Sequence, residues 1–235
     1  MNLIRASKKI IGFLKGRSGF NINNPLGGNG ERVDIQMKES LDYNHLDLYQ
    51  KSHYKRYEFA LDQIKEGDIC GDFACGTGYG SVLLAKKAGK LVGADIDKVV
   101  VSKIKERYKK NLKVEFQHAN ILDLNYTNIF DVIVSFETLE HLEENDLRTA
   151  LQIFCNALKP GGRFIFSSPY MQERSEDAVK LGFHLTFYIS EEKLREWLQA
   201  AGFEIESINY QNYTSHTIMP NLEEKDFIIC IAVKH

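Results

Sequence analysis

The 235-residue sequence is poor in cysteine and proline, with four residues of each type. The cysteines are Cys70, Cys75, Cys155 and Cys230, and they form neither a C-x-x-C pair nor a dense cluster. Disulfide frameworks and cysteine-based zinc sites both depend on such patterns. We therefore expect reduced thiols, a cytoplasmic location and no zinc held by cysteine.

The sequence also lacks a long apolar run and a marked excess of charge. The longest apolar runs, 131–136 and 227–233, fall well short of the ~20 residues that a membrane-spanning helix needs. Thirty basic residues against 32 acidic ones leave a formal charge of −2, which creates no overall basic field. We therefore expect no integral membrane segment and no nucleic-acid partner.

Residues 1–30 differ from the rest of the chain because they carry five basic residues and no acidic one. Apolar residues are interleaved with the basic ones, and the stretch ends in the turn-rich segment NINNPLGGNG. We expect a basic amphipathic arm followed by a linker. A surface arm is the main interpretation, and weak peripheral contact of residues 1–20 with a membrane is the alternative.

From residue 46 onward, helix-like and strand-like segments alternate. A helix is expected at 46–64, before the first strand. The strand-like segments are 69–74, 90–94, 113–118, 131–136 and 162–168. Helix-like segments at 81–88, 99–108 and 146–158 separate them. A last helix at 190–201 then precedes two more strands, at 203–210 and 227–233. This pattern predicts an α/β fold: a doubly wound, Rossmann-like mixed sheet of seven strands, the last one antiparallel, with helices on both faces.

The first strand leads into a helix through a glycine-rich loop, DFACGTGYGS. Gly76 and Gly78 would let a ligand approach the backbone next to the free N–H groups of the helix. Ser81 stands at the third glycine position of the dinucleotide fingerprint, so that fingerprint is incomplete. Asp72 would repel a pyrophosphate and attract a cation. The loop therefore predicts a cationic ligand such as S-adenosylmethionine, which carries a sulfonium and an ammonium group.

A second carboxylate, Asp95, ends the second strand in the segment LVGADID. A carboxylate at this place can accept hydrogen bonds from two ribose hydroxyls. Ile96 would lie against the adenine ring, and Asp97 is expected to cap the next helix.

In order and spacing, these motifs resemble those of the class I S-adenosylmethionine-dependent methyltransferases, over roughly residues 46–235. Ala74 stands where many members have glycine, and Asn120 stands where the family usually has an aspartate that receives the adenine amino group. The resemblance implies a methyltransferase domain at 31–235, with N-terminal lid helices at 31–66 and an acceptor lid at 169–190.

The same resemblance implies a set of residues that bind the cosubstrate. Arg56 would neutralise the methionine carboxylate, Tyr57 would close over it, and Ile121 would offer its backbone N–H to the ring. The complete expected set is Arg56, Tyr57, Asp72, Ala74, Gly76, Gly78, Asp95, Ile96, Asn120, Ile121 and Phe136.

Candidate catalytic residues follow the fourth strand in the segment SFETLEHL. Glu137, Glu140 and His141 would share one face of a helical turn at the edge that faces the ligand. We expect His141 to act as general base for a hydroxyl acceptor, with Glu137 beside it. His184 in the acceptor lid is the alternative base, and Tyr170 and Tyr188 would help to line the acceptor.

The E-x-x-E-H arrangement of Glu137, Glu140 and His141 is similar to the one in quinone-biosynthesis O-methyltransferases, where it is thought to gather a divalent metal. Two carboxylates and an imidazole suit such an ion, but the sequence identifies no fourth ligand. Catalysis without a metal is therefore the expectation, and a divalent metal at these three residues is the alternative.

Taken together, the motifs predict an S-adenosylmethionine-dependent methyltransferase that acts on a small molecule. The expected acceptor is a hydroxyl oxygen of a sugar or glycan precursor, or of a phenolic metabolite. The alternatives are an NAD-linked oxidoreductase and a nucleoside-binding protein without catalysis.

Overall fold

The computed structural model describes residues 32–37, 43–176, 179 and 184–235. The basic arm and linker expected at 1–30 lie outside these residues, as does the membrane contact considered for residues 1–20. In the described part of the chain, no helix combines the length and the apolar character that crossing a membrane would need.

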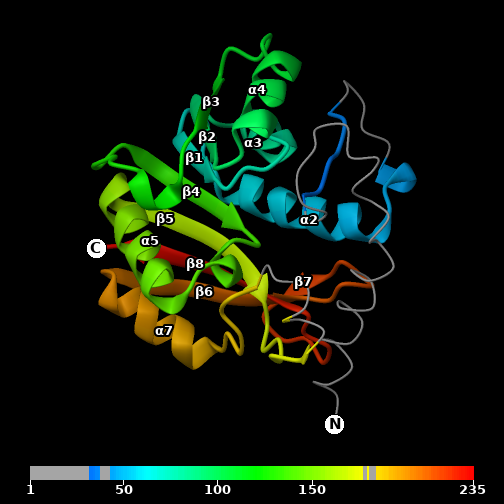
Figure 1. The fold of residues 1–235 in the computed structure, drawn as a ribbon, viewed down its shortest axis with the longest axis vertical. Helices are drawn as coiled ribbons and strands as arrows, with labels where there is room; N and C mark the ends of the chain where they lie inside the picture. The colour runs from blue at the N-terminus through cyan, green and yellow to red at the C-terminus, as the bar shows by residue number, and fades with distance from the viewer. Residues whose placement is uncertain (1–31, 38–42, 177–178, 180–183) are drawn as a thin grey trace.

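The centre of the fold is one mixed sheet with the strand order β3-β2-β1-β4-β5-β8-β6-β7 (Figure 1). Its strands are β1 (Ile69–Phe73), β2 (Lys90–Asp95), β3 (Val114–His118), β4 (Phe130–Phe136), β5 (Leu158–Pro169), β6 (Phe203–Gln211), β7 (Ile218–Met219) and β8 (Phe227–Lys234). Strands β1 to β5 pair in parallel. β8 lies between β5 and β6 and is antiparallel to both, as expected for the last strand.

The sheet has eight strands, so the expected number of seven is wrong. The additional strand, β7, consists of two residues that pair antiparallel with Tyr210 and Gln211 at the end of β6. A two-residue strand has no room for the alternation of apolar and polar side chains by which strands are recognised in a sequence.

The α-helices that accompany the sheet are α2 (Leu48–Gln63), α3 (Tyr79–Leu84), α4 (Lys98–Arg107), α5 (Glu144–Ala157) and α7 (Glu191–Ala200). A capping box begins α2, in which Asp47 accepts from the Gln50 backbone and Gln50 accepts from the Asp47 backbone. Ser190 caps α7 in the ordinary way, through its hydroxyl. These local signals explain why the expected helices form.

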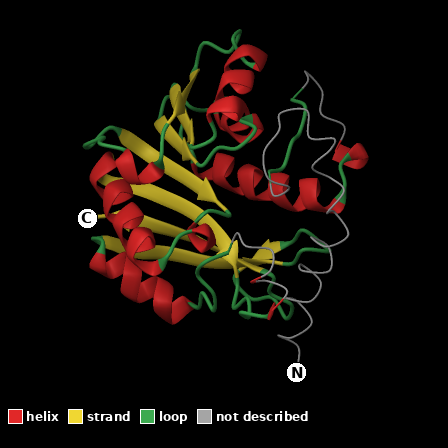
Figure 2. Ribbon diagram, viewed as in Figure 1, coloured by secondary structure: helices red, strands yellow, loops and turns green. Residues whose placement is uncertain are grey.

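Helices cover both faces of the sheet, as expected (Figure 2). Successive residues of β4 show why, since their side chains point to opposite faces. Ile133 packs in the core that also holds α5 and α7, whereas Val132 and Val134 pack in the core that holds α2 and α3. The alternation along one central strand thus divides the interior into two apolar layers.

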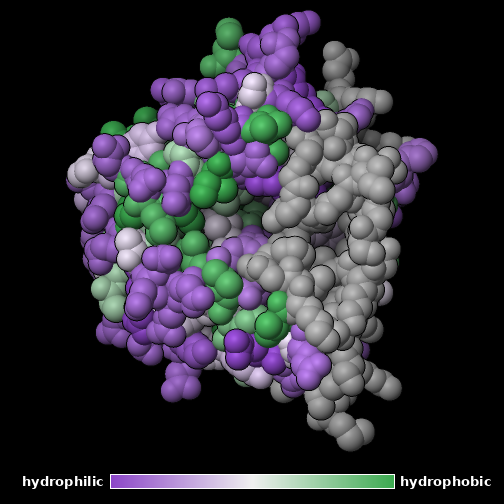
Figure 3. Space-filling model, viewed as in Figure 1, coloured by the Kyte–Doolittle hydropathy of each residue, from purple (hydrophilic) through white to green (hydrophobic). Residues whose placement is uncertain are grey.

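Most apolar side chains of the described residues are in these layers, and hydrophilic ones cover much of the face drawn in Figure 3. All four cysteines are buried and free of disulfides. With the core so arranged, the carboxyl ends of β1, β2 and β4 meet at one edge of the sheet, where the loops can form a binding site.

Candidate active site

A cavity of about 510 Å³ lies at the carboxyl edge of the parallel strands. Its walls come from the loops after β1, β2, β3 and β4, from α2, and from the segments 32–33 and 185. The lining residues are Arg32, Val33, His53, Tyr57, Ala74, Cys75, Gly76, Thr77, Tyr79, Asp95, Ile96, Ala119, Asn120, Ile121, Phe136, Glu137, Thr138, His141, Leu142 and Leu185. Most of the expected cosubstrate residues are among them.

The glycine-rich loop after β1 turns through left-handed backbone conformations. Ala74, Gly76 and Gly78 have φ angles of 62°, 53° and 72°. At Gly78 a Cβ atom would lie 2.8 Å from the ring of Phe116, so both the angle and the space require glycine there. Ala74 and Gly76 line the cavity, and Gly78 packs against the interior instead.

Asp72 is fully buried beneath this loop and does not line the cavity. Its Oδ1 accepts from the Tyr57 hydroxyl at 3.1 Å, and its Oδ2 accepts from the Ser81 hydroxyl at 2.5 Å. Burial raises the pKa of the Asp72 carboxyl to about 7, although both hydroxyls oppose the shift. The Asp72 carboxyl is therefore hydrogen-bonded inside the protein, and its expected direct contact with a cationic ligand stays a prediction. Asp72 joins α2 to the loop.

Asp95, at the end of β2, faces the cavity and is 4% exposed. Its Oδ2 accepts from the Gly76 backbone N–H at 2.9 Å, and its Oδ1 accepts from the Asp97 backbone N–H at 2.9 Å. The Arg32 guanidinium also donates to Oδ1, at 3.1 Å, and pairs with Asp97 at 3.3 Å. Asp97 caps α4 through the N–H groups of Val99 and Val100, as expected.

The residues expected around the adenine ring also line the cavity. Ile96 is 63% exposed at the edge of the cavity, and Ile121 and Phe136 are buried in its lining. Asn120 lines the cavity as well, and its side-chain oxygen accepts from the Leu122 backbone N–H at 3.1 Å. These four residues come together as predicted, and their contact with adenine stays a prediction.

Arg56 occupies a different place from the one expected. Its side chain is fully buried, does not line the cavity, and pairs with Glu137 at 2.5 Å between Nη1 and Oε1. The guanidinium also donates to the Ser167 hydroxyl and lies 4.3 Å from the ring centroid of Phe227. Glu137 thus already supplies a carboxylate partner to Arg56, and the expected contact of Arg56 with the methionine carboxylate stays a prediction.

Glu137 follows β4 directly and lines the cavity. Its backbone φ angle is 50°, which is uncommon for a residue other than glycine. Its carboxylate pairs with Arg56 and accepts from the Ser167 hydroxyl at 2.7 Å. Because these partners hold the carboxylate in a fixed place, Glu137 is suited to positioning its neighbours.

His53 and Tyr79 form a polar pair in the opposite wall, joined by a hydrogen bond between Nδ1 and the tyrosine hydroxyl. Burial, followed by the charge of Arg56, holds the pKa of His53 well below its usual value. His53 is therefore a neutral imidazole in the folded protein. No role was predicted for His53 from the sequence, although its four-residue spacing from Tyr57 in α2 places both side chains on one face of the helix.

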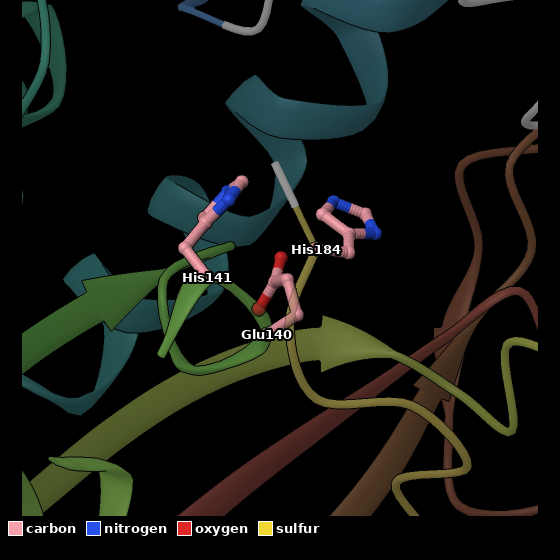
Figure 4. A group of neighbouring side chains, drawn as sticks. All are labelled: Glu140, His141 and His184. Carbon is pink, nitrogen blue, oxygen red and sulfur yellow. The ribbon is translucent and has the colours of Figure 1, made fainter. Parts of the chain in front are cut away.

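His141, in the cavity lining, belongs to a group of three side chains with Glu140 and His184 (Figure 4). One ligand atom from each lies within 4.8 Å of the others, and the Glu140 carboxyl points toward the space between the two rings. Glu140 is 1% exposed; its Oε2 accepts from the Ser168 hydroxyl at 2.9 Å, and its Oε1 has no hydrogen-bond partner. The expected group of Glu137, Glu140 and His141 is therefore corrected: His184 takes the place of Glu137, which Arg56 holds.

Burial governs the protonation of this group. It raises the pKa of the Glu140 carboxyl well above its usual value, with the charge of Glu137 acting in the same direction. It lowers the pKa of His184 to about 3, with His141 as the second cause. His184 is thus neutral, and its Nδ1 lies 2.6 Å from the side-chain oxygen of Gln172.

The segment that contains His184 is tied to the turn after β4. The backbone N–H groups of Leu185 and Thr186 both donate to the carbonyl of Glu140, and the Thr186 hydroxyl donates to the carbonyl of Leu142. Leu185 thereby joins the cavity lining. The expected acceptor residues do not line it: Tyr170 packs on Tyr210 with ring centroids 5.0 Å apart, Tyr188 is 44% exposed, and His184 lies beside Glu140 and His141.

Several lining residues were missed by the sequence reasoning: Arg32, Tyr79, Thr138, Leu142 and Leu185. Arg32 lies outside the region of family resemblance and near no recognisable motif. Thr138 and Leu142 belong to the segment SFETLEHL, in which only Glu137, Glu140 and His141 were predicted to have a role.

Comparisons with known proteins agree with this geometry. Residues 71–162 match the family described as Methyltransferase domain. A probable S-adenosylmethionine-dependent methyltransferase of Mycolicibacterium smegmatis is 34% identical over 159 residues, which cover 65% of this chain and 60% of that protein. O-methyltransferase resE of Aspergillus sclerotiorum is 30% identical over 144 residues, covering 57% and 54%. A demethylmenaquinone methyltransferase of Clavibacter sepedonicus is 29% identical, covering 63% and 70%. The chain thus spans little more than half the length of the first two relatives.

Solved structures share the architecture. The N-methyltransferase NodS of Bradyrhizobium japonicum, in complex with S-adenosyl-L-homocysteine, has a TM-score of 0.62 at 18% identity, covering 81% of this chain and 89% of that one. An S-adenosylmethionine-dependent methyltransferase of Clostridium acetobutylicum has a TM-score of 0.64 at 16% identity, covering 81% and 93%. At such identities the likeness shows the fold.

Proposed function

We propose that this chain, whose residues 71–162 match the Methyltransferase domain family, is an S-adenosylmethionine-dependent methyltransferase that transfers a methyl group from S-adenosylmethionine to a hydroxyl oxygen of a small molecule. The observation that carries this proposal is one cavity lined both by the Asp95 carboxylate beside the glycine-rich loop and by His141, which groups with Glu140 and His184. We take the Asp95 side as the cosubstrate end and the His141 side as the acceptor end.

The cosubstrate end fits S-adenosylmethionine in size and in chemistry. Asp95 would accept from the ribose hydroxyls, while Ile96 and Ile121 would enclose the adenine ring between apolar surfaces. The buried Asp72 carboxyl would act from beneath the loop as a charge that favours a cation. S-adenosylmethionine supplies a methyl group on a positively charged sulfur, which is already a good leaving group.

The protein then has to hold the acceptor oxygen in line with the methyl group and to remove its proton. We propose His141 for this second task, because it lines the cavity. His184 stays the alternative base, although its depressed pKa makes it the weaker proton acceptor. The names of two relatives, an O-methyltransferase and a demethylmenaquinone methyltransferase, support a sugar or phenolic acceptor without deciding between them.

A divalent metal is a second way to activate a hydroxyl group at this end. The unpartnered, buried Oε1 of Glu140 favours it, because a cation would supply the partner that this oxygen lacks. Two imidazoles and one carboxylate suit transition metals such as Zn²⁺, Mn²⁺ or Fe²⁺ better than Mg²⁺. Glu140, His141 and His184 would hold the ion, and Glu137 would not.

The test combines product formation with binding. Purified protein receives S-adenosylmethionine carrying a labelled methyl group and a panel of sugar and phenolic acceptors, and labelled products are identified. His141→Ala should lower turnover with little change in the affinity for S-adenosylhomocysteine, whereas Asp95→Ala should weaken that affinity. Full turnover by His141→Ala would show that the base lies elsewhere.

The metal is tested separately by titrating Zn²⁺ and Mn²⁺ into chelator-treated protein and following the heat of binding. Binding that is lost in Glu140→Gln and kept in Glu137→Gln would support the metal at the corrected set of residues. Absence of binding, with turnover that chelators do not change, would leave His141 as a base acting alone. A thermal-shift comparison with NADH tests the oxidoreductase alternative, which has no support from the relatives.

A further inference from the structure

The segment 32–37 crosses the glycine-rich loop and is fixed there at several points. The Val33 carbonyl accepts from the Thr77 hydroxyl at 2.7 Å, and Asp34 pairs with both Nη atoms of Arg107 at 2.7 and 3.2 Å. Val33 and Ile35 are buried in the core that holds α2 and α3. The segment is therefore docked on the domain, and it carries Arg32 into the cavity.

Arg32 is bound to the carboxylate that the proposed function gives to the ribose. Its Nη2 lies 3.1 Å from Asp95 Oδ1, and its Nη1 lies 3.3 Å from Asp97 Oδ2. Its side chain also runs past the loop, since Cγ lies 3.8 Å from the position of a Cβ atom on Gly76. The guanidinium thus lies where a ligand of Asp95 has to enter.

Asp95 has too few acceptor sites for its present hydrogen-bond donors and a ribose together. A carboxylate has about four lone-pair sites. Oδ1 already accepts from Arg32 and from the Asp97 N–H, and Oδ2 accepts from the Gly76 N–H. One acceptor site is left, whereas a ribose offers two hydroxyl donors to a carboxylate. One of the existing donors has to leave when a ribose binds.

Of the three donors, Arg32 is the one that can move. The N–H groups of Gly76 and Asp97 belong to the backbone of a tight loop and of a helix cap. Arg32 has a flexible side chain with a second carboxylate, Asp97, already within reach. Asp97 remains its partner after Asp95 is given up, so displacement leaves no unpaired charge.

We propose that Arg32 is an autoinhibitory latch that competes with the ribose of the cosubstrate for Asp95 and moves onto Asp97 when the cosubstrate binds. The proposal rests on the proposed function, because it takes the ligand of Asp95 to be a nucleoside. The docked segment 32–37 then determines the affinity for the cosubstrate. It does so through Arg32, which contacts Asp95 rather than the cosubstrate itself.

The test is calorimetric titration of S-adenosylhomocysteine, adenosine and 2′,3′-dideoxyadenosine into the wild type and Arg32→Met. Methionine keeps the apolar stem and removes the charge. The latch predicts that Arg32→Met binds the first two ligands about three- to tenfold more tightly, as for the loss of one competing ion pair. Dideoxyadenosine has no diol to compete with Arg32, so its affinity should change less than adenosine's.

Two further variants separate the latch from simpler causes. Arg107→Met removes the other ion pair of the segment without touching Asp95, and it should leave the affinities unchanged. Asp97→Asn keeps the helix cap but weakens the alternative partner of Arg32, so this variant should bind S-adenosylhomocysteine less tightly than the wild type. Adding Arg32→Met to Asp97→Asn should restore the lost affinity.

The outcomes are distinct. Weaker or unchanged binding of S-adenosylhomocysteine by Arg32→Met, with a wild type that binds it, overturns the latch and leaves the proposed function standing. An equal gain in Arg107→Met also overturns it, because loosening of the segment would then be the cause. Binding by neither the wild type nor Arg32→Met overturns both proposals.

Discussion

Arg56 in the middle of α2 and Glu137 at the end of β4 form an ion pair directly behind the cavity, with Nη1 and Oε1 2.5 Å apart. Arg56 is fully buried, and its Nε and Nη2 have no hydrogen-bond partner. The pair therefore connects the helix that covers the cosubstrate end to the turn that carries His141. It also explains how Glu137 is held in a left-handed backbone conformation.

The first prediction concerns this pair. Glu137→Gln should lower the free energy of unfolding by about 3–5 kcal/mol, because it leaves a buried guanidinium without its countercharge. Arg56→Met in the Glu137→Gln background should recover part of the loss, since no buried charge then remains. Urea denaturation measures both.

Arg163 and Glu206 provide a matched control, because they form an ion pair at the surface with side chains 31% and 38% exposed. Glu206→Gln should cost less than about 1 kcal/mol. If Glu137→Gln costs no more than Glu206→Gln, the buried pair has no structural role of the kind described.

Asp72 should make stability depend on pH. Burial raises its pKa from 3.8 to about 7, so the folded protein holds this proton more tightly than the unfolded chain does. Between these two values the folded state binds more protons, and the contribution of Asp72 to stability decreases as the pH rises from about 4 to about 7. Asp72→Asn removes the titration.

The measurement is the free energy of unfolding of the wild type minus that of Asp72→Asn, at several values of pH. The difference should decline with rising pH across this window and level off above it. Ser81→Ala is the companion variant: because the Ser81 hydroxyl holds the pKa of Asp72 down, its loss should extend the decline to higher pH. A difference that is constant between pH 4 and pH 7 would contradict the assignment.

Gly80 is the closest approach of α3 to α2. A Cβ atom at this position would lie 2.1 Å from the Tyr57 ring, which is itself buried and bonded to Asp72. Gly80→Ala should therefore displace Tyr57, cost about 1–3 kcal/mol as other overpacked sites do, and weaken the binding of S-adenosylhomocysteine. Thermal unfolding and calorimetry measure the two effects.

Gly161 is the control for the Gly80 substitution. Nothing lies within 4 Å of a Cβ atom there, so Gly161→Ala introduces backbone strain at a φ angle of 74° without a clash. It should lower stability modestly and leave ligand affinity unchanged. An equal loss of affinity in both variants would mean that the Gly80–Tyr57 contact does not support the cavity.

The sequence was most informative where a residue's role depends on its near neighbours. The apolar run of β4, the cap of α4 at Asp97 and the glycine loop can each be recognised within a few residues, and each forms as predicted. Asp95 was placed correctly for the same reason, since a polar residue directly after a buried parallel strand has to lie at the carboxyl edge of the sheet.

Contacts between distant parts of the chain could not be read in this way. Arg56 and Glu137 are 81 positions apart, and each has several carboxylates or cations closer in sequence. Arg56 was therefore predicted to bind the cosubstrate and Glu137 to stand beside the catalytic base, rather than to pair with each other. His184 lies in a segment without helical or strand periodicity, so only the folded structure brings it to Glu140. Arg32 lies before the first recognised element.

The last prediction concerns the segment that carries His184 and Leu185. The buried Thr186 hydroxyl donates to the Leu142 carbonyl at 2.6 Å and so holds this segment against the turn after β4. Thr186→Val keeps the shape but leaves the carbonyl without that donor, which costs about 1–3 kcal/mol. Hydrogen exchange at the amide of Leu185 should become faster, because its bond to the Glu140 carbonyl opens more often.

Thr149→Val is the control, because it removes an exposed hydroxyl bond within α5, and it should leave the exchange at Leu185 unchanged. In turnover assays Thr186→Val should raise the KM for the acceptor without changing the affinity for S-adenosylhomocysteine, since only the acceptor end of the cavity is loosened. A change in cosubstrate affinity with normal exchange at Leu185 would show that Thr186 does not act through this segment.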